Sequence, residues 1–281
     1  MTFPLEISGY SQGLYSSWYW LKNAKILLDC GDGCAAKLGP SCGAIKAILL
    51  SHGHIDHISG LPAILWARNA AMGPNQKTLP IYFPTGDPYV AKMRAFLEDV
   101  GGEKFKVSWR EIAPGEVFSV GSRDFETFPT QHTESHATVG YKMIEWKRVL
   151  KPQFADLERE KIIEHRMNGT WEEISEKVGE CVAAFCGDSV PVEAKYLRDA
   201  QIVFHEATAL SDKDLGEKNH STLAQALEVA REANPQHLVL THYSSRYGRT
   251  QFAEAARDAA REMNLDFRVW CFLKDDLRLV F

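Results

Sequence analysis

Residues 51–57 of the chain are Ser51-His52-Gly53-His54-Ile55-Asp56-His57. They hold three of the ten histidines of this 281-residue chain, together with an aspartate. The preceding residues 45–50 are mostly apolar and predict a short buried strand. Because His52 and His54 alternate in an extended segment, both rings can point to one side, while Asp56 and His57 can serve a second ion. Zinc and similar divalent ions prefer neutral imidazole and carboxylate ligands, so the stretch predicts a metal site.

Further candidate ligands stand where other predicted strands end. They are His132 after residues 125–130, Asp188 after residues 182–185, His205 after residues 202–204 and His242 after residues 237–240. Loops converge at strand ends in layered α/β folds, and functional sites gather there. Together with residues 52–57, these positions supply a ligand set for two ions that share one aspartate.

The order of predicted elements favours an α/β layered fold. Short apolar runs that predict strands dominate the first half, with helices predicted over residues 60–72 and 89–100. After residue 180, strands and helices alternate, including a helix predicted over residues 192–198. Since a domain typically has about 150 residues, a chain of this length forms one or two domains. Because both halves contribute to one predicted site, we expect a single domain over residues 1–281.

Composition excludes several classes of protein. The formal net charge is −5, with 45% hydrophobic and 25% charged residues, as in ordinary globular enzymes. No run approaches the roughly 18 apolar residues that a membrane helix needs, and the first residues do not resemble a secretory signal. The six cysteines lie in or beside apolar runs, which predicts buried thiols in a reducing compartment, and the lack of a CxxC pair argues against a thiolate zinc site. We therefore expect a cytoplasmic protein with no membrane partner; a local basic groove for nucleic acid stays compatible with this charge.

The metal-ligand pattern resembles the metallo-β-lactamase fold, and four further motifs resemble the ribonuclease Z family, the tRNA 3′-processing endonucleases. The motifs are Leu28-Asp29-Cys30-Gly31-Asp32-Gly33, His205-Glu206-Ala207-Thr208, His220-Ser221-Thr222 and Thr241-His242-Tyr243-Ser244-Ser245-Arg246-Tyr247. Gly60-Leu61-Pro62 also follows the metal motif as it does in that family. The resemblance spans residues 26–247 and implies a four-layer αββα sandwich.

The resemblance also implies a role for each residue of the site. His52, His54 and His132 would bind one zinc ion, Asp56, His57 and His242 a second, and Asp188 would bridge the two. Asp29 would orient a ligand imidazole, and Asp56 would take a proton from the attacking water. His220, oriented by Glu206, would protonate the leaving oxygen, and Ser244 and Arg246 would hold a phosphate oxygen. Manganese or iron could occupy the same ligands, and His136 is a rival to His132.

Residues 147–180 depart from the family pattern. The family carries here a basic arm that grips tRNA, whereas this segment has seven basic and eight acidic residues. The composition predicts a charged helical insertion on the surface, either a solvated helical pair or a dimer contact. The resemblance implies a homodimer.

Several substrates and functions therefore stay open. Precursor tRNA is the first expectation, and a small phosphodiester such as a cyclic nucleotide is the second. A thioester or lactone hydrolase and a non-catalytic metal or nucleic-acid binding module are further alternatives. A GxSxG pattern, Gly9-Tyr10-Ser11-Gln12-Gly13, precedes a predicted strand over residues 14–21 rather than a helix, which argues against a serine nucleophile.

Overall fold

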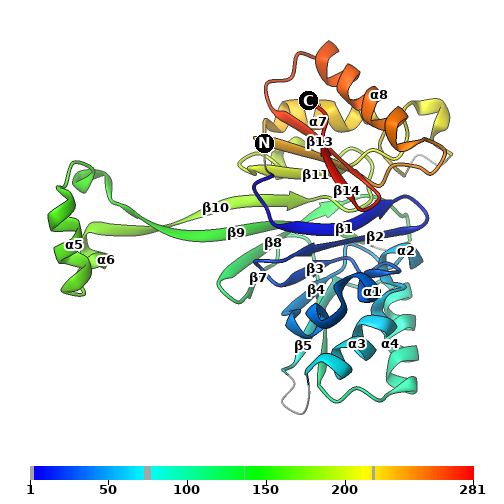
Figure 1. The fold of residues 1–281 in the computed structure, drawn as a ribbon, viewed down its shortest axis with the longest axis horizontal. Helices are drawn as coiled ribbons and strands as arrows, with labels where there is room; N and C mark the ends of the chain where they lie inside the picture. Colours follow the sequence, from blue (N-terminus) through cyan, green and yellow to red (C-terminus); the bar gives the residue numbers. More distant parts are fainter. Residues whose placement is uncertain (1–2, 73–76, 136, 217–218) are drawn as a thin grey trace.

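A computed structural model of the chain describes residues 3–72, 77–135, 137–216 and 219–281. Two β-sheets face each other, and helices cover the outer face of each sheet (Figure 1). This arrangement confirms the predicted four-layer αββα sandwich. None of the helices in the described ranges is long and apolar enough to cross a membrane.

The first sheet comes from the N-terminal part of the chain. Its strand order is β1-β2-β3-β4-β5-β6, and β3 to β6 run parallel. The strands are β1 (Ile7–Gln12), β2 (Ser16–Leu21), β3 (Ile26–Leu28), β4 (Ala47–Leu49), β5 (Leu79–Pro84) and β6 (Val107–Ile112). β3 and β4 are buried throughout, as expected of parallel strands between two covering layers.

The second sheet has the strand order β14-β13-β12-β11-β10-β9-β8-β7, with β10 to β13 parallel. Its strands are β7 (Val117–Val120), β8 (Arg123–Thr130), β9 (Thr138–Leu150), β10 (Ser175–Phe185), β11 (Ile202–Glu206), β12 (His237–Thr241), β13 (Arg268–Leu273) and β14 (Asp276–Leu279). β11 and β12 are buried throughout and run parallel, so their carboxyl ends point to the same edge of the sheet.

Helices complete the outer layers. The first sheet is covered by α1 (Cys34–Leu38), α3 (Leu61–Met72) and α4 (Pro88–Val100), and the second by α7 (Leu223–Ala233) and α8 (Arg249–Glu262) (Figure 1). In α7, Ala226, Leu227 and Ala230 recur at helical spacing and are fully buried against the sheet. Asp87 begins α4 by accepting hydrogen bonds from the backbone amides of Tyr89 and Val90, at 2.9 and 3.0 Å.

Apolar side chains fill the space between the two sheets. Leu28 and Leu49 of the first sheet belong to the same buried cluster as Phe125, Phe204 and Val239 of the second. The two sheets are therefore fixed relative to each other along the strands that end at the predicted site.

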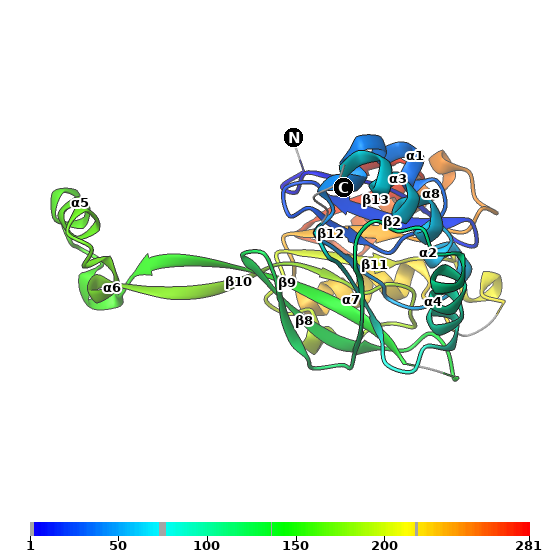
Figure 2. The same cartoon turned by 90° about the horizontal axis from the view of Figure 1, so that it is seen from below.

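The segment predicted as a helical insertion is a projecting arm. Strands β9 and β10 continue beyond the sheet as an antiparallel ribbon and carry a short 3₁₀ turn (Pro152–Phe154), α5 (Arg159–Met167) and α6 (Trp171–Ile174) at its end (Figures 1 and 2). The helical prediction was wrong at both flanks, where Leu150 pairs with Ser175 and Lys147 with Val178. Cross-strand pairing outweighs the local helical propensity of these charged residues. A predicted helix over residues 192–198 is likewise only a 3₁₀ turn (Ala194–Tyr196).

Candidate metal centre

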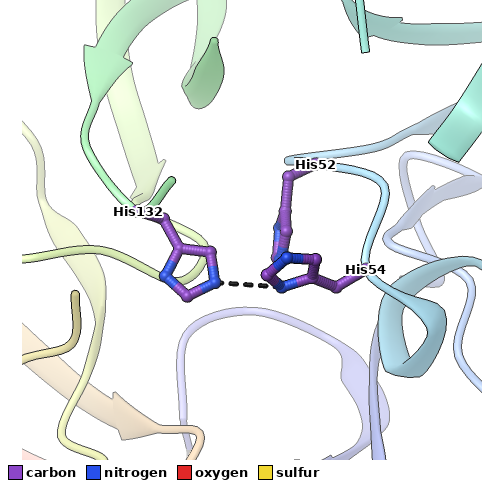
Figure 3. A group of neighbouring side chains, drawn as sticks. All are labelled: His52, His54 and His132. Atoms are coloured by element: carbon purple, nitrogen blue, oxygen red, sulfur yellow. Dashed lines mark hydrogen bonds between the residues drawn. The ribbon is translucent and has the colours of Figure 1, made fainter. Parts of the chain in front are cut away.

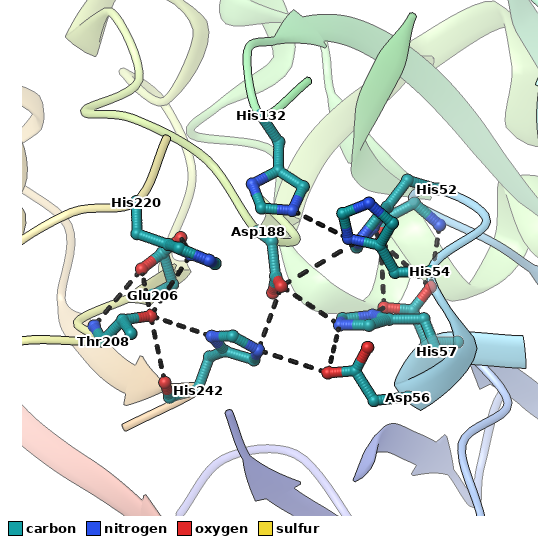
Figure 4. Close-up of polar contacts among 12 residues, drawn as sticks. His52, His54, Asp56, His57, His132, Asp188, Glu206, Thr208, His220 and His242 are labelled. Carbon is teal, nitrogen blue, oxygen red and sulfur yellow. Dashed lines mark hydrogen bonds and ion pairs between the residues drawn. The ribbon is translucent and has the colours of Figure 1, made fainter. Parts of the chain in front are cut away.

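The predicted ligands meet where strands of both sheets end. Residues 52–57 follow β4 and include the short helix α2 (Ile55–Ile58); His132 follows β8, Asp188 follows β10 and His242 follows β12. Figure 4 shows these side chains converging on one site. In the first sheet β3 runs parallel to β4, and in the second β10, β11 and β12 run parallel to one another. The loops that follow parallel strands start at the same edge of a sheet, and the site lies where these two edges meet.

His52, His54 and His132 form one group of potential ligands. Their ligand nitrogens lie within 4.8 Å of one another, and Nε2 of His132 is 3.1 Å from Nδ1 of His54 (Figure 3). His52 and His132 are buried, and His54 is half-buried beside a pocket. The rival residue His136 lies outside the described residues.

Asp56, His57, Asp188 and His242 form a second group, again with ligand atoms within 4.8 Å of one another. Oδ2 of Asp188 lies 3.2 Å from Nε2 of His57 and 3.0 Å from Nε2 of His242. The same oxygen is 3.9 Å from Nε2 of His52 in the first group. Asp188 therefore stands between the two groups, where a bridging carboxylate would be needed.

The side chain of Asp29 orients His57. Its Oδ2 is 2.8 Å from Nδ1 of His57, and its Oδ1 accepts a 2.7 Å hydrogen bond from the backbone amide of Ser51. The Ser51 hydroxyl lies 3.0 Å from both Asp29 and Nδ1 of His52. When Ser51 donates to the carboxylate, it accepts from His52, so both imidazoles carry their proton on Nδ1 and turn Nε2 inward.

Oxygen acceptors fix two more imidazoles in the same way. Nδ1 of His132 is 2.9 Å from the backbone oxygen of Asn219, and Nδ1 of His242 is 2.8 Å from the hydroxyl of Thr208. The backbone amide of His242 also donates to the buried hydroxyl of Ser11 at 2.8 Å. His242 has a φ of 56°, an uncommon conformation for a residue with a side chain, so these contacts hold it in a strained position.

The unpaired atoms of the site fit divalent metal ions. Nε2 of His52 is buried and has no hydrogen-bond partner among the described residues, while Nε2 of His57 and of His242 faces only carboxylate oxygens, at 3.2 and 3.0 Å from Oδ2 of Asp188. Burying a polar nitrogen costs free energy of folding unless a hydrogen-bond partner or a metal ion binds it. Inward-facing imidazole nitrogens beside buried carboxylates, once their protons are displaced, are the donor set of zinc and similar ions.

The charges of the protein without metal differ between the two groups. Burial lowers the pKa of His52, His54 and His132, so these imidazoles are neutral near pH 7. Burial also opposes the charge of His57 and His242, but the Asp188 carboxylate outweighs it, raising the pKa of His57 well above 6.5 and that of His242 to about 10.

Two glycines allow the loops to approach each other. A Cβ atom on Gly53, between the two motif histidines, would meet Oδ1 of Asp87 at 2.3 Å. Gly187, directly before Asp188, has a φ of 63°, and a Cβ there would lie 2.6 Å from Cβ of Ser51. These positions need glycine because the backbone packs against neighbouring elements and, at Gly187, is left-handed.

A histidine–carboxylate pair stands beside the ligand groups. Nδ1 of His220 is 2.6 Å from Oε1 of Glu206, and the His220 ring lies 4.6 Å from that of His132 and 5.2 Å from that of His242. Burial opposes the charge of His220, but the carboxylate raises its pKa above 6.5. The pair can therefore hold a proton on His220, next to the metal ligands. The His220 side chain is 18% exposed, whereas that of Glu206 is completely buried.

The residues after His220 anchor it. The Ser221 hydroxyl donates to the backbone oxygen of Ser189 at 2.8 Å. Thr222 begins α7 and exchanges hydrogen bonds with Gln225 in a capping box. The motif His220-Ser221-Thr222 therefore attaches one reactive side chain to the start of a rigid helix.

A pocket of about 350 Å³ opens onto these groups. Its lining includes His54, Asp56, Asp188, His220 and His242. Ser244 and Arg246, predicted to hold a phosphate oxygen, line the same pocket. The Arg246 guanidinium donates to the backbone oxygen of Asp214 at 2.7 Å, which keeps its charge at the rim.

One strand-end candidate lies outside the ligand groups. His205 is fully buried, with Nδ1 2.8 Å from the backbone oxygen of Glu206 and Nε2 accepting a 3.3 Å hydrogen bond from the amide of Val192. Sequence reasoning missed the supporting roles of Ser11 and Thr208. Ser11 lies in the GxSxG pattern within β1, and no signal there points to His242, whereas Thr208 stands in a quoted motif.

Comparison with known proteins agrees with this geometry. Residues 24–150 match the model of the beta-lactamase superfamily domain. The chain is 30% identical to ribonuclease Z of Methanosarcina mazei over 255 residues, which cover 81% of this chain and 80% of that protein. It is 29% identical to ribonuclease Z of Methanopyrus kandleri over 243 residues, covering 83% and 82% of the two chains.

Solved structures share the fold. A metallo-beta-lactamase fold protein from Bacillus subtilis aligns with a TM-score of 0.66 and 17% identity, over 97% of this chain and 98% of that chain. The short form of human tRNase Z aligns with a TM-score of 0.61 and 22% identity, over 85% and 93% of the two chains. The sequence relatives, the fold and the cluster of metal-binding side chains agree: the chain belongs to the ribonuclease Z family and is a metal-dependent hydrolase.

Proposed function

We propose that this protein is a phosphodiesterase with a dinuclear metal centre that cuts RNA at the 3′ end of precursor tRNA. The observation that carries the proposal is the His220–Glu206 pair beside two groups of metal-binding side chains. A ribose oxygen is a poor leaving group, and its departure needs an acid positioned beside the metal centre.

The two groups of side chains would each hold one ion. His52, His54 and His132 would bind the first, Asp56, His57 and His242 the second, and Asp188 would contact both. When bound, two divalent cations lower the pKa of the attacking water and neutralise phosphate charge. Zinc suits these ligands, and manganese or iron suits them as well.

Two side chains of the protein would move protons. Asp56 lies at the edge of the pocket and can accept a proton from the attacking water. The Glu206 carboxylate raises the pKa of His220 and so favours its charged form, in which Nδ1–H is donated to Glu206 and a second proton sits on Nε2. His220 can give that Nε2 proton to the leaving oxygen. Figure 4 shows Asp56 and His220 on opposite sides of Asp188. This placement suits in-line displacement at phosphorus, with water attacking on the side of Asp56 and the leaving oxygen departing on the side of His220.

The names of the relatives support RNA as the substrate. Two curated relatives are named ribonuclease Z, and a structural neighbour is a tRNase Z. Ser244 and Arg246 would hold a phosphate oxygen at the pocket. The arm projects far enough from the body to touch a distant part of a large substrate (Figure 2).

The charge of the arm favours a second candidate, a small phosphodiester such as a cyclic nucleotide. Seven basic and eight acidic residues are mixed over residues 147–180, and pairs such as Arg148 with Glu172 neutralise each other. An arm that follows phosphates needs an excess of positive charge. A small substrate would use the same metal centre without the arm.

A cleavage assay separates the two candidates. Zinc-loaded protein is incubated with a 3′-extended precursor tRNA, with Asp56→Ala as the inactive control, and the product end is mapped. A single cut after the discriminator base supports tRNA processing. No cut by folded, metal-replete protein, together with hydrolysis of a cyclic nucleotide, contradicts it in favour of the small substrate.

A further inference from the structure

An apolar hollow lies beside the predicted metal centre, on the side of α2 and α4. It encloses about 570 Å³, within the range of ligand-binding sites. Its apolar lining consists of Leu14, Ile55, Ile58, Tyr89, Met93 and Phe96. These residues come from the turn between β1 and β2, from α2 and from α4, so three separate segments build one surface.

Much of this lining is exposed. Leu14 is 83%, Ile55 66% and Phe96 54% exposed. Grouped apolar side chains on a protein surface usually mark a binding site. The hollow contrasts with the neighbouring pocket, whose lining includes Asn219, His220 and Arg246.

The hollow is continuous with the catalytic pocket. Leu14, His54 and Asp56 line both spaces, and the Tyr89 ring packs edge-on against the ring of His54 at 5.9 Å. A phosphodiester has two ester groups on its phosphorus atom. When the phosphate reaches the metal ligands, one ester group is therefore directed toward His220 and the other toward the hollow. Because His220 serves the leaving group, the hollow faces the group that keeps the phosphate.

We propose that this hollow binds the nucleoside that retains the phosphate, and that its base stacks on Phe96 and Tyr89. The inference rests on the proposed phosphodiesterase function and names the substrate group that the site would select. Aromatic side chains bind any base by its face, so stacking gives affinity without sequence preference. Lys92, whose Nζ lies 5.7 Å from the centre of the Tyr89 ring, places a cation where the next phosphate of an RNA strand would pass.

The proposal has a consequence for RNA substrates. A base inside a duplex is already stacked and paired, and its face is not open to a protein side chain. The nucleotide on the phosphate-keeping side of the cut must then be unpaired. The hollow would select a single-stranded flank as the place of cleavage.

Two small esters test the hollow without involving His220. In thymidine 5′-(4-nitrophenyl phosphate) and in methyl 4-nitrophenyl phosphate, water attacks phosphorus, the bond to the aryl oxygen breaks, and 4-nitrophenolate leaves without needing a proton. The two esters differ only in the group that keeps the phosphate. We expect kcat/KM of the nucleoside ester to exceed that of the methyl ester, and Phe96→Ala to reduce this ratio by roughly 5- to 100-fold.

Two further variants control this experiment. Phe96→Tyr keeps a stacking face and should restore the ratio. Trp66 on α3 is another exposed aromatic side chain, 71% exposed, and it does not line the hollow. Trp66→Ala should therefore leave the ratio unchanged.

Each outcome has one meaning. Equal kcat/KM for the two esters in the unmodified protein, or an unchanged ratio in Phe96→Ala, overturns the inference while the phosphodiesterase function stands. If neither ester is hydrolysed by metal-replete protein, the proposed function itself fails. If Phe96→Ala converts a dimer to a monomer in sedimentation and lowers both rates equally, the surface is a subunit contact and the inference is wrong.

Discussion

Nδ1 of His220 lies 2.6 Å from Oε1 of Glu206, and the carboxylate is completely buried. The same carboxylate accepts hydrogen bonds from the backbone amides of Ser189 and Ser221 and from the hydroxyl of Thr208. Burial opposes its charge, but His220 outweighs this effect and lowers the pKa of Glu206. Glu206 is therefore a fixed anion that holds Nδ1–H of His220 and favours the charged imidazole, whose Nε2 proton is left for the substrate.

His220→Ala should slow substrates according to their leaving group. An alkoxide leaving group needs a proton, so the rate on RNA should fall by about 10²- to 10⁴-fold. A 4-nitrophenyl phosphodiester needs none, and its rate should change far less. Steady-state kcat on both substrates measures the difference.

His165→Ala provides the matched control for the ester assay, because His165 lies in α5 on the arm, away from the ligand groups. It should leave the 4-nitrophenyl ester rate unchanged. Equal losses on RNA and on the aryl ester in His220→Ala would remove the acid role from His220.

The ligand stretch could be predicted from the sequence because its geometry is local. Residues 52–57 follow a short buried strand, and alternation along that segment places His52 and His54 on one side. The later ligands could be found because each ends a strand in the same sheet. The sequence alone joined the strand ends and residues 52–57 into one ligand set for two ions, and the resemblance assigned each ligand to one of the ions.

Supporting contacts between distant segments could not be predicted. Ser11 binds the amide of His242 across 231 residues of chain, and nothing in its neighbourhood indicates this. The flanks of the arm were mistaken for helix because residues 147–150 and 175–180 are mostly charged, whereas its end is helical in α5 and α6. Their pairing as strands depends on β9 and β10 already lying side by side in the sheet.

Asp56→Asn should abolish hydrolysis of every phosphodiester while the fold survives. Asparagine keeps the size of the side chain but cannot take a proton, so a loss of about 10²-fold or more is expected. Circular dichroism and bound metal per chain check the fold and the centre. Turnover close to that of the unmodified protein would exclude Asp56 from the mechanism.

Asp29→Asn should weaken metal binding by about 10- to 100-fold, because the carboxylate orients His57 and, through Ser51, His52. Asp29 has a φ of 52°, which asparagine tolerates, so the backbone can keep its conformation. Competition with a chromogenic zinc chelator measures the affinity.

Asp32→Asn is the control for this experiment, since Asp32 is an exposed carboxylate three residues further along the same motif. It should bind zinc as the unmodified protein does. Unchanged affinity in Asp29→Asn would show that the hydrogen bond to His57 does not support the centre.

The two metal ions should differ in the protons that they displace. His52, His54 and His132 have lowered pKa values and are neutral near pH 7, so an ion there displaces almost no protons. His57 and His242 have raised pKa values, about 10 for His242, and carry protons at pH 7 that an ion must displace. Binding of the second ion should release about two protons, and its affinity should fall as the pH falls from 8 to 6.

Calorimetric titration of metal-free protein at pH 7, in buffers with different heats of ionisation, counts the released protons for each ion. His57→Ala should reduce the count for the second ion by about one, because one of the two charged imidazoles is gone. The affinity for the second ion falls with falling pH because metal and proton compete for the same imidazole nitrogens, and a lower pH favours the protonated imidazoles. Two ions with identical proton release would contradict the different charges assigned to the two groups.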